Sequence, residues 1–355
     1  MTDAAPPNPA LESFLRSIPL FSLIETSDMI DVLRLLRPME LTPGQVLFRQ
    51  GEAGTAMWVL GSSTEVSISA ASAQQQRPGV IAYARAGETV GEMALIDDGP
   101  RSGTAVVMQG GHAHQIDAVD FHAMRQTYSP PVFKILRRLC VELCGKLRAT
   151  SDRIVAPSGR TVPTAHTRVR KATDDDVNAF GPLARLPKVV KLALAQKVTV
   201  VTLDGVEPLF SEGEDGDSAY FIINGDISVG RNGKTLTTVH KGGMLGLVSV
   251  IDRGRRSASC ISAGPATLLR LSREEFNSLF TSGNRFAFDL VELVSRQLVA
   301  HVRDANDLVP RPGQIQARLT PPRPIPALRE EDILPQVEIL PLELDVDLED
   351  FDVTP

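Results

Sequence analysis

Cysteine, aromatic residues and long apolar runs are all scarce in this sequence. Its 355 residues include three cysteines and one tryptophan, and aromatic side chains make up 5%. Three cysteines are too few, and odd in number, for the disulfide framework of a secreted domain. No stretch approaches the roughly twenty apolar residues of a membrane helix, and the first residues lack the basic and apolar parts of a signal peptide. We therefore expect a cytoplasmic protein that does not contact a membrane.

Catalytic and metal-binding motifs are lacking as well. The sequence has no Walker loop, no zinc-peptidase motif and no Gly-x-Ser-x-Gly elbow. His112 and His114 form a His-x-His pair, but no third ligand accompanies them, so a zinc site is not expected. We therefore predict a protein that is not an enzyme, with no catalytic residues, metal site or cofactor.

Positive charge is not concentrated in any part of the chain. The formal net charge is −6, and the segment from Arg329 to the C-terminus holds ten acidic residues and one basic residue. The remaining charges nearly balance, and no helix-turn-helix pattern follows the apolar segments. Because DNA binding needs a positive surface for phosphate contacts, we expect no DNA partner.

What the chain does contain is one order of segments that occurs twice. Helical periodicity between Leu11 and Leu36 is followed, from Leu41 to Val107, by short apolar runs broken by glycines, which are typical of strands. Helical periodicity returns from Asp117. The same order recurs in residues 183–196, 198–270 and 272–307. We therefore expect a duplication of one unit of about 130 residues.

Two constant offsets align the copies. The Phe-x-x-Gly-Glu-x-Gly turn of residues 48–54 recurs 162 residues later, and matching residues of the segment 91–121 recur 155 residues later. The two offsets differ by seven residues, and these extra residues of the first copy fall near Ala71–Pro78, a polar and glutamine-rich stretch. We expect this stretch to form a surface loop.

Residues 91–105, with the sequence GEMALIDDGPRSGTA, combine the features of an anion site. Gly91 permits a tight turn, and the free backbone N–H groups of the short helical stretch after it attract an anion. Arg101 can pair two phosphate oxygens through its guanidinium group, and Ser102 adds a hydroxyl donor. Glu92 lies beside the anion, so its carboxylate is better suited to accept a hydrogen bond from a ribose hydroxyl. These features together fit a cyclic nucleoside monophosphate.

This segment resembles the phosphate-binding cassette of cyclic-nucleotide-binding domains, as in the catabolite activator protein and the regulatory subunits of cyclic-AMP-dependent protein kinase. The Gly-Glu-x-Ala-Leu start and the Pro-Arg-Ser end carry the resemblance, which covers residues 12–153 and, more weakly, 181–307. It implies an α+β, mainly β fold: two tandem β-rolls of the double-stranded β-helix or jelly-roll type, each flanked by helices. It also implies that Glu92 holds the ribose 2′-OH, and that the N–H of Ala94 and the side chain of Arg101 hold the cyclic phosphate.

The resemblance favours cyclic AMP (cAMP) over cyclic GMP (cGMP) as the ligand. A serine follows the cassette arginine here, whereas cGMP binders often have a threonine at that position. The ligand-binding residues expected in the first copy are Gly91, Glu92, Met93, Ala94, Arg101, Ser102 and Thr104.

The second copy departs from this pattern. Leu247 replaces the ribose-binding glutamate, and Arg255 replaces the proline before the cassette arginine. A buried ribose hydroxyl without its acceptor costs about 1–3 kcal/mol, which predicts binding roughly ten- to a hundredfold weaker, or a different anion. The alternative is a degenerate domain retained for packing or dimerisation. The candidate ligand residues of this copy are Gly246, Ser249, Arg256 and Ser257.

Composition outside the two copies sets the remaining boundaries. We expect a disordered N-terminus (1–11), a first domain (12–153), a linker (154–180), a second domain (181–307) and a proline-rich acidic tail (308–355). Apolar and acidic side chains alternate in residues 333–353. This pattern fits either a solvated disordered tail or a strand that adds to a sheet edge of this protein or of a protein partner.

We expect a non-enzymatic sensor. In this interpretation a cyclic nucleotide binds the first domain and moves helices that relay its presence to the second domain and to a protein partner, a relay implied by the family resemblance. The alternative is a scaffold or assembly protein that uses these folds without binding nucleotide. The sequence leaves open whether the protein forms a homodimer.

Overall fold

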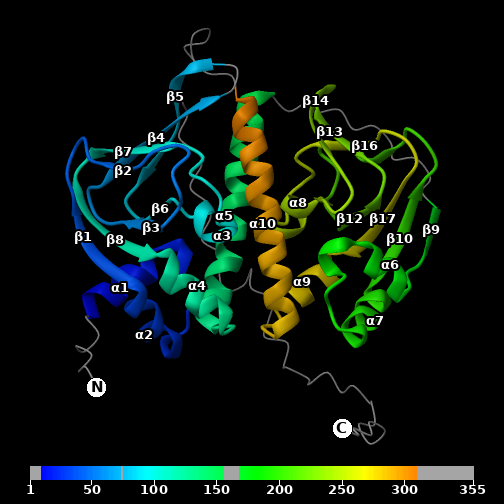
Figure 1. The fold of residues 1–355 in the computed structure, drawn as a ribbon, viewed down its shortest axis with the longest axis horizontal. Helices are drawn as coiled ribbons and strands as arrows, with labels where there is room; N and C mark the ends of the chain where they lie inside the picture. The colour runs from blue at the N-terminus through cyan, green and yellow to red at the C-terminus, as the bar shows by residue number, and fades with distance from the viewer. Residues whose placement is uncertain (1–8, 73–74, 156–167, 310–355) are drawn as a thin grey trace, which may run out of the picture. The chain divides into compact units, whose positions relative to one another are not determined.

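The computed structural model describes residues 9–72, 75–155 and 168–309 (Figure 1). Two β-rich units with flanking helices account for them, and we name these units domain A (residues 9–155) and domain B (residues 168–309). The predictions for the acidic tail, for most of the N-terminus and for linker residues 156–167 lie outside the described residues. Among the described helices, none combines the length and the hydropathy needed to cross a membrane.

Domain A contains two four-stranded antiparallel sheets. Its elements in chain order are α1 (Pro9–Ser17), the 3₁₀ helix η1 (Pro19–Phe21), α2 (Thr26–Leu35), β1 (Leu36–Leu41), β2 (Val46–Phe48), β3 (Ala56–Leu60), β4 (Glu65–Ser72), β5 (Gln75–Arg85), β6 (Thr89–Val90), α3 (Met93–Asp97), β7 (Thr104–Gln109), β8 (Gly111–Asp117), α4 (Ala118–Gln126) and α5 (Pro130–Ile154). The strand orders are β1-β8-β3-β6 and β2-β7-β4-β5.

Domain B repeats this topology with one additional edge strand, β9. Its elements are β9 (Arg168–Lys171), α6 (Asp174–Ala179), η2 (Gly181–Leu183), α7 (Lys188–Lys197), β10 (Val198–Leu203), β11 (Pro208–Phe210), β12 (Ser218–Asn224), β13 (Ile227–Arg231), β14 (Lys234–Val239), β15 (Met244–Leu245), α8 (Leu247–Ile251), β16 (Ser259–Ser262), β17 (Ala266–Ser272), α9 (Arg273–Thr281) and α10 (Arg285–Leu308). The strand orders are β15-β12-β17-β10-β9 and β11-β16-β13-β14. The predicted duplication and the predicted α+β, mainly β fold are confirmed.

Strand β3 shows how the core of each domain is divided between two layers. All five of its residues are buried. Because successive side chains of a strand point to opposite faces, Trp58 and Leu60 join the core between the two sheets, whereas Met57 and Val59 join the core beneath the helices. Strands that are buried on both faces read as continuous apolar runs, and β12 repeats the pattern in domain B.

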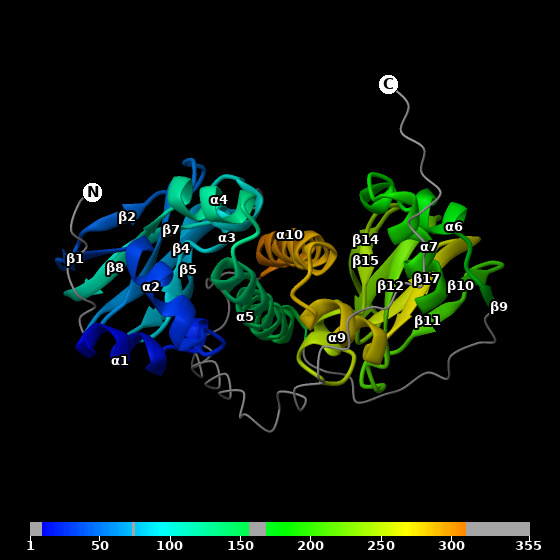
Figure 2. The same cartoon turned by 90° about the horizontal axis from the view of Figure 1, so that it is seen from below.

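Helices α5 and α10 pack against each other (Figures 1 and 2). Helix α5 begins with Pro130 and Pro131, and proline suits a first helical turn because the N–H that it lacks has no helical partner there. The rings of Phe133 from α5 and Phe288 from α10 stack with their centroids 5.8 Å apart. Each domain thereby supplies one long helix to a shared apolar contact.

Two segments differ from their predicted structure. Residues 168–180, where composition predicts a linker, form β9 at the edge of a sheet and then α6, because Thr173 and Asp176 form a capping box at the start of that helix. The seven extra residues near Ala71–Pro78 lengthen the hairpin of β4 and β5 rather than forming only a loop. Polar residues occur in hairpins as well as in loops, so polarity does not distinguish between the two.

Candidate functional site

Arg101 lies buried at the centre of the domain A cassette. Its side chain is held by two backbone carbonyls, with Nη1 donating to Gly91 O at 2.8 Å and Nη2 donating to Ala56 O at 2.6 Å. The guanidinium carbon lies 4.3 Å from the ring centroid of Phe48 and 5.5 Å from that of Trp58. Burial lowers the pKa of Arg101. A cation desolvated in this way favours an anionic partner.

Domain B builds the same arginine site. Arg256 Nη1 donates to Ser218 O at 2.7 Å and to Gly246 O at 3.3 Å. Its guanidinium carbon lies 4.1 Å from the ring centroid of Phe210 and 5.8 Å from that of Tyr220. In both domains the arginine Nε is buried and has no hydrogen-bond partner within the described residues. Each site therefore holds an arginine with unused donor capacity.

The Gly-Glu turn that identifies the duplication positions each arginine. In domain A, Gly51 N donates to Arg101 O at 2.9 Å, and Arg101 N donates to Glu52 O at 2.8 Å. In domain B, Gly213, Glu214 and Arg256 make the same two bonds at 2.9 and 2.8 Å. The motif thus fixes the backbone of the cassette arginine.

Glycine is required at the turn of each domain by close approach and at the start of the domain A cassette by its backbone angle. A Cβ at Gly54 would overlap Ala94, and a Cβ at Gly216 would overlap Ser249, so the turn and the cassette helix meet without room for a side chain. Gly91 has a φ of +88°, in the left-handed region that glycine adopts readily. These local constraints explain why the motif repeats with constant spacing.

Glu92, the expected ribose acceptor, is buried and ion-paired. Its Oε1 accepts a hydrogen bond from Lys146 Nζ of helix α5 at 2.5 Å. Glu142, one turn earlier on α5, accepts from Thr89 Oγ1 at 3.3 Å. Burial raises the pKa of Glu142, whereas Glu92 and Glu142 together outweigh burial and raise the pKa of Lys146. The pairing therefore fixes the Glu92 carboxylate at the cassette and leaves its Oε2 as a further acceptor.

The sequence analysis missed this lysine because Lys146 lies in an apolar helical run. The offset of 155 residues between the two copies was the available signal, because it shows which residues of domain B occupy the equivalent positions. It pairs Lys146 with His301 and Glu142 with Gln297, as it pairs Glu92 with Leu247. All three members of the ionic group in domain A are thus replaced in domain B.

The remaining candidate residues differ in how close they lie to the arginines. Ser102 Oγ lies 3.9 Å from Met93 Sδ within the domain A cassette. Thr104 accepts a hydrogen bond from Gln50 N at 3.0 Å, which ties its hydroxyl to the neighbouring turn. In domain B, Ser249 Oγ accepts from Arg256 Nη1 at 2.9 Å, and Ser257 lines a cavity. Of these residues, Ser249 bonds its arginine directly, and Ser257 lines the same cavity as Arg256.

Each long helix also contacts the cassette of the other domain. Arg303 of α10 binds Asp97 through two hydrogen bonds of 3.0 and 3.1 Å and donates to Pro100 O at 2.7 Å. Arg148 of α5 binds the equivalent Asp252 and donates to Arg255 O at 2.8 Å. Arg148 and Arg303 are themselves 155 residues apart, so the contact is reciprocal. Sequence patterns within one domain could not indicate this pairing.

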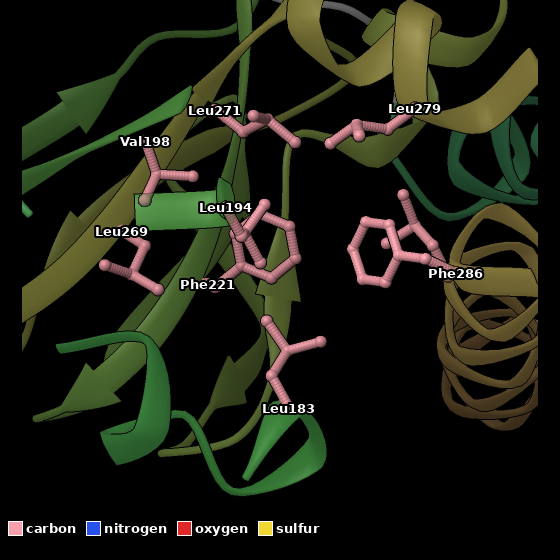
Figure 3. A pocket seen from close by; sticks show the side chains of 9 residues that line it. Leu183, Leu194, Val198, Phe221, Leu269, Leu271, Leu279 and Phe286 are labelled. Atoms are coloured by element: carbon pink, nitrogen blue, oxygen red, sulfur yellow. The ribbon is translucent and has the colours of Figure 1, made fainter. Parts of the chain in front are cut away.

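The described residues include two cavities of very different character. One, of about 10 Å³, lies among apolar side chains of domain B such as Phe221 and Phe286 (Figure 3). That volume is near the limit for one water, and its walls offer a water no polar partner. The other, of about 100 Å³, lies at Arg256 and Leu247. No group of three or more potential metal ligands occurs in the described part of the chain.

Comparison with known proteins identifies the class to which these domains belong. The family of the cyclic nucleotide-binding domain matches residues 38–128 and 200–282. The chain therefore carries two tandem domains of this family, and the predicted family is confirmed.

Individual relatives align with about a third of the chain or with most of it. The chain is 30% identical over 117 residues to the cyclic AMP receptor protein of Thermus thermophilus, an alignment that covers 32% of this chain and 54% of that protein. It is 23% identical over 261 residues to the cAMP-dependent protein kinase regulatory subunit of Debaryomyces hansenii, covering 73% of this chain and 48% of that protein. The chain thus spans about half the length of each of these curated relatives.

Among solved structures, one match extends over most of the chain at a low TM-score. The regulatory domain of Toxoplasma gondii protein kinase A with cAMP matches with 17% identity and a TM-score of 0.30, over 78% of this chain and 92% of that one. The tandem layout resembles that of kinase regulatory subunits.

Proposed function

We propose that the protein is a cyclic-nucleotide sensor in which domain A binds cAMP. The observation that carries this proposal is the pairing of a buried arginine, whose Nε is unpartnered, with a buried carboxylate in one cassette. Arg101 is 4% exposed and Glu92 is 3% exposed. An arginine and a carboxylate in one cassette match a ligand with one negative charge and a hydroxyl group.

Each side chain has a distinct role in this proposal. Arg101 donates to the cyclic phosphate, with the N–H of Ala94 as a second donor. Glu92 accepts from the ribose 2′-OH, while Lys146 holds the carboxylate in place. Ser102 favours cAMP over cGMP, as the resemblance implies.

The contacts between the domains suggest how binding is relayed. Arg303 of α10 holds Asp97 and Pro100, which precede Arg101 in the cassette. A ligand that holds this cassette in one conformation therefore favours the position of α10 in which Arg303 is bound to the cassette. Because α10 belongs to domain B, occupancy of domain A shifts the equilibrium of domain B and of any partner bound there. No catalytic step is required of the protein.

Substitution of the two cassette arginines tests the proposal. Loss of Arg101 leaves the buried ligand anion unpaired at a cost of about 3–5 kcal/mol, so Arg101→Ala should weaken cAMP binding at least a hundredfold in calorimetry. Arg256→Ala removes the equivalent side chain of domain B and serves as the matched control, with domain A affinity retained within threefold. Binding of cAMP by Arg101→Ala within threefold of the parent would show that the cassette is not the cAMP site and would favour the scaffold alternative.

A further inference from the structure

Domain B contains a cavity of about 100 Å³ beside its cassette. Its walls come from the β-roll, including Phe210 and Leu245, from Leu147 and Ile154 of α5, and from Ala305 of α10. A cavity of roughly 150 Å³ lined by apolar side chains can hold benzene. The cavity of domain B is therefore of the size of one small ring or a short alkyl chain, and smaller than a whole nucleotide.

A buried cation lies at this cavity. Arg256 lines it and is 3% exposed, and its Nε has no hydrogen-bond partner within the described residues. Its ionic contact, Nη2 to Asp217 Oδ1, is long at 3.3 Å, and the Asp217 side chain is 61% exposed. A buried guanidinium group that is weakly paired favours an anionic ligand.

The rest of the lining disfavours the usual ligand of the family. Leu247 and His301 line the cavity where domain A has the Glu92–Lys146 ion pair, so the position of Glu92 offers no carboxylate to a ribose hydroxyl here. Burial lowers the pKa of His301 to about 4, which leaves the imidazole neutral near pH 7. The acidic lining residue is Asp304, whose pKa is raised by burial and by Asp307. Arg256 is thus the cationic group that a ligand meets.

We propose that this cavity binds a small organic acid with a single anionic group on a ring or short alkyl body, and without a ribose. The anionic group pairs with Arg256, and the apolar body contacts Leu247 and the adjoining helices α5 and α10. This proposal does not rest on cAMP binding in domain A.

Titration of the full chain with benzoate tests the proposal. Benzyl alcohol has the same ring without the charge, and acetate has the charge without the ring. We expect benzoate to bind with one site per chain and at least tenfold more tightly than either control. Benzoate binding that is undetectable, or no tighter than that of benzyl alcohol, would overturn the proposal.

Two pairs of variants locate the site. Ala305→Leu fills the cavity with a good helix former and should weaken benzoate binding at least tenfold, whereas Ala300→Leu on the exposed face of α10 should leave it within twofold. Arg256→Gln should abolish benzoate binding, and Arg101→Gln should leave it unchanged. If Arg256→Gln does not fold, Ala305→Leu still decides the outcome. Benzoate binding that survives Ala305→Leu, or that depends on Arg101 instead, would contradict the assignment to domain B.

Discussion

At the scale of single residues, the sequence predicted the arginine sites but not the groups around them. Arg101 and Arg256 follow from their motifs, and the structure places both in buried aromatic surroundings. Lys146 could not be predicted, because its partner Glu92 is 54 residues away and the pairing depends on how α5 lies against the β-roll. The replacement of this ion pair by Leu247 and His301 therefore became clear only in the folded chain.

A pH dependence of stability follows from His301. Its pKa is lowered to about 4 by burial, from an ordinary value of about 6.5 in the unfolded chain. Between these pH values the unfolded chain binds a proton at this histidine that the folded chain does not. The contribution of His301 to the free energy of unfolding is therefore full above about pH 6.5 and is lost as the pH falls toward 4.

Chemical denaturation of the wild-type protein and His301→Gln measures this contribution. Relative to the variant, the wild type should lose roughly 1–2 kcal/mol of unfolding free energy between pH 7 and pH 4.5. Asp304 titrates in both proteins and largely cancels from the comparison. A difference that stays constant across this range would show that His301 is not buried in its neutral form.

At the scale of the elements, the duplicated pattern predicted the strands and helices of both domains. Alternation of side chains and glycine-rich turns are local properties, and they are enough to place the strands of a jelly roll. The linker prediction failed at β9 and α6, because the acidic residues there start a helix through the Thr173 capping box instead of remaining in a loop. Composition alone does not separate these two uses of acidic residues.

The packing of helix α5 does not explain the presence of one of its residues, Arg138. Arg138 is fully buried, and none of its three side-chain nitrogens has a hydrogen-bond partner within the described residues. Burial lowers its pKa, against the opposing charge of Glu142. The equivalent residue of α10 is Leu293.

Replacement of this arginine by the residue found in domain B should stabilise the protein. Buried charges without good partners are often improved by apolar groups, by about 1–4 kcal/mol. We expect Arg138→Leu to raise the free energy of unfolding by about 1–3 kcal/mol in denaturant titrations. A variant less stable than the wild type would show that the guanidinium group makes a favourable interaction in the native protein.

At the scale of the whole molecule, the reciprocal arginines connect the two domains. Arg148 and Arg303 occupy equivalent positions on α5 and α10, and each binds the cassette turn of the opposite domain. A pattern within one repeat carries no information about contacts with the other. Only the packing of α5 against α10 brings these groups together, which is why the sequence predicted suitable helices but not the route of the relay.

The relay predicts that a residue of domain B affects binding in domain A. Arg303→Met removes the contacts that hold Asp97 and Pro100, so the affinity of domain A for cAMP should fall about three- to tenfold, or roughly 0.7–1.4 kcal/mol. Arg148→Met is the matched control, because it removes the equivalent contact to domain B and should leave cAMP affinity within twofold. Equal effects of the two substitutions would argue against a direct contribution of α10 to the cassette of domain A.

Calorimetric titration of the wild-type chain with cAMP is the most direct test of the central claim, that the two domains carry the same arginine site but differ in ligand. In the proposed function, Glu92 is the ribose acceptor of domain A, and Leu247 offers no acceptor at the equivalent position of domain B. The account predicts one tight cAMP site per chain, with any second site roughly ten- to a hundredfold weaker. Two equivalent tight sites, or no binding of cAMP at all, would contradict it.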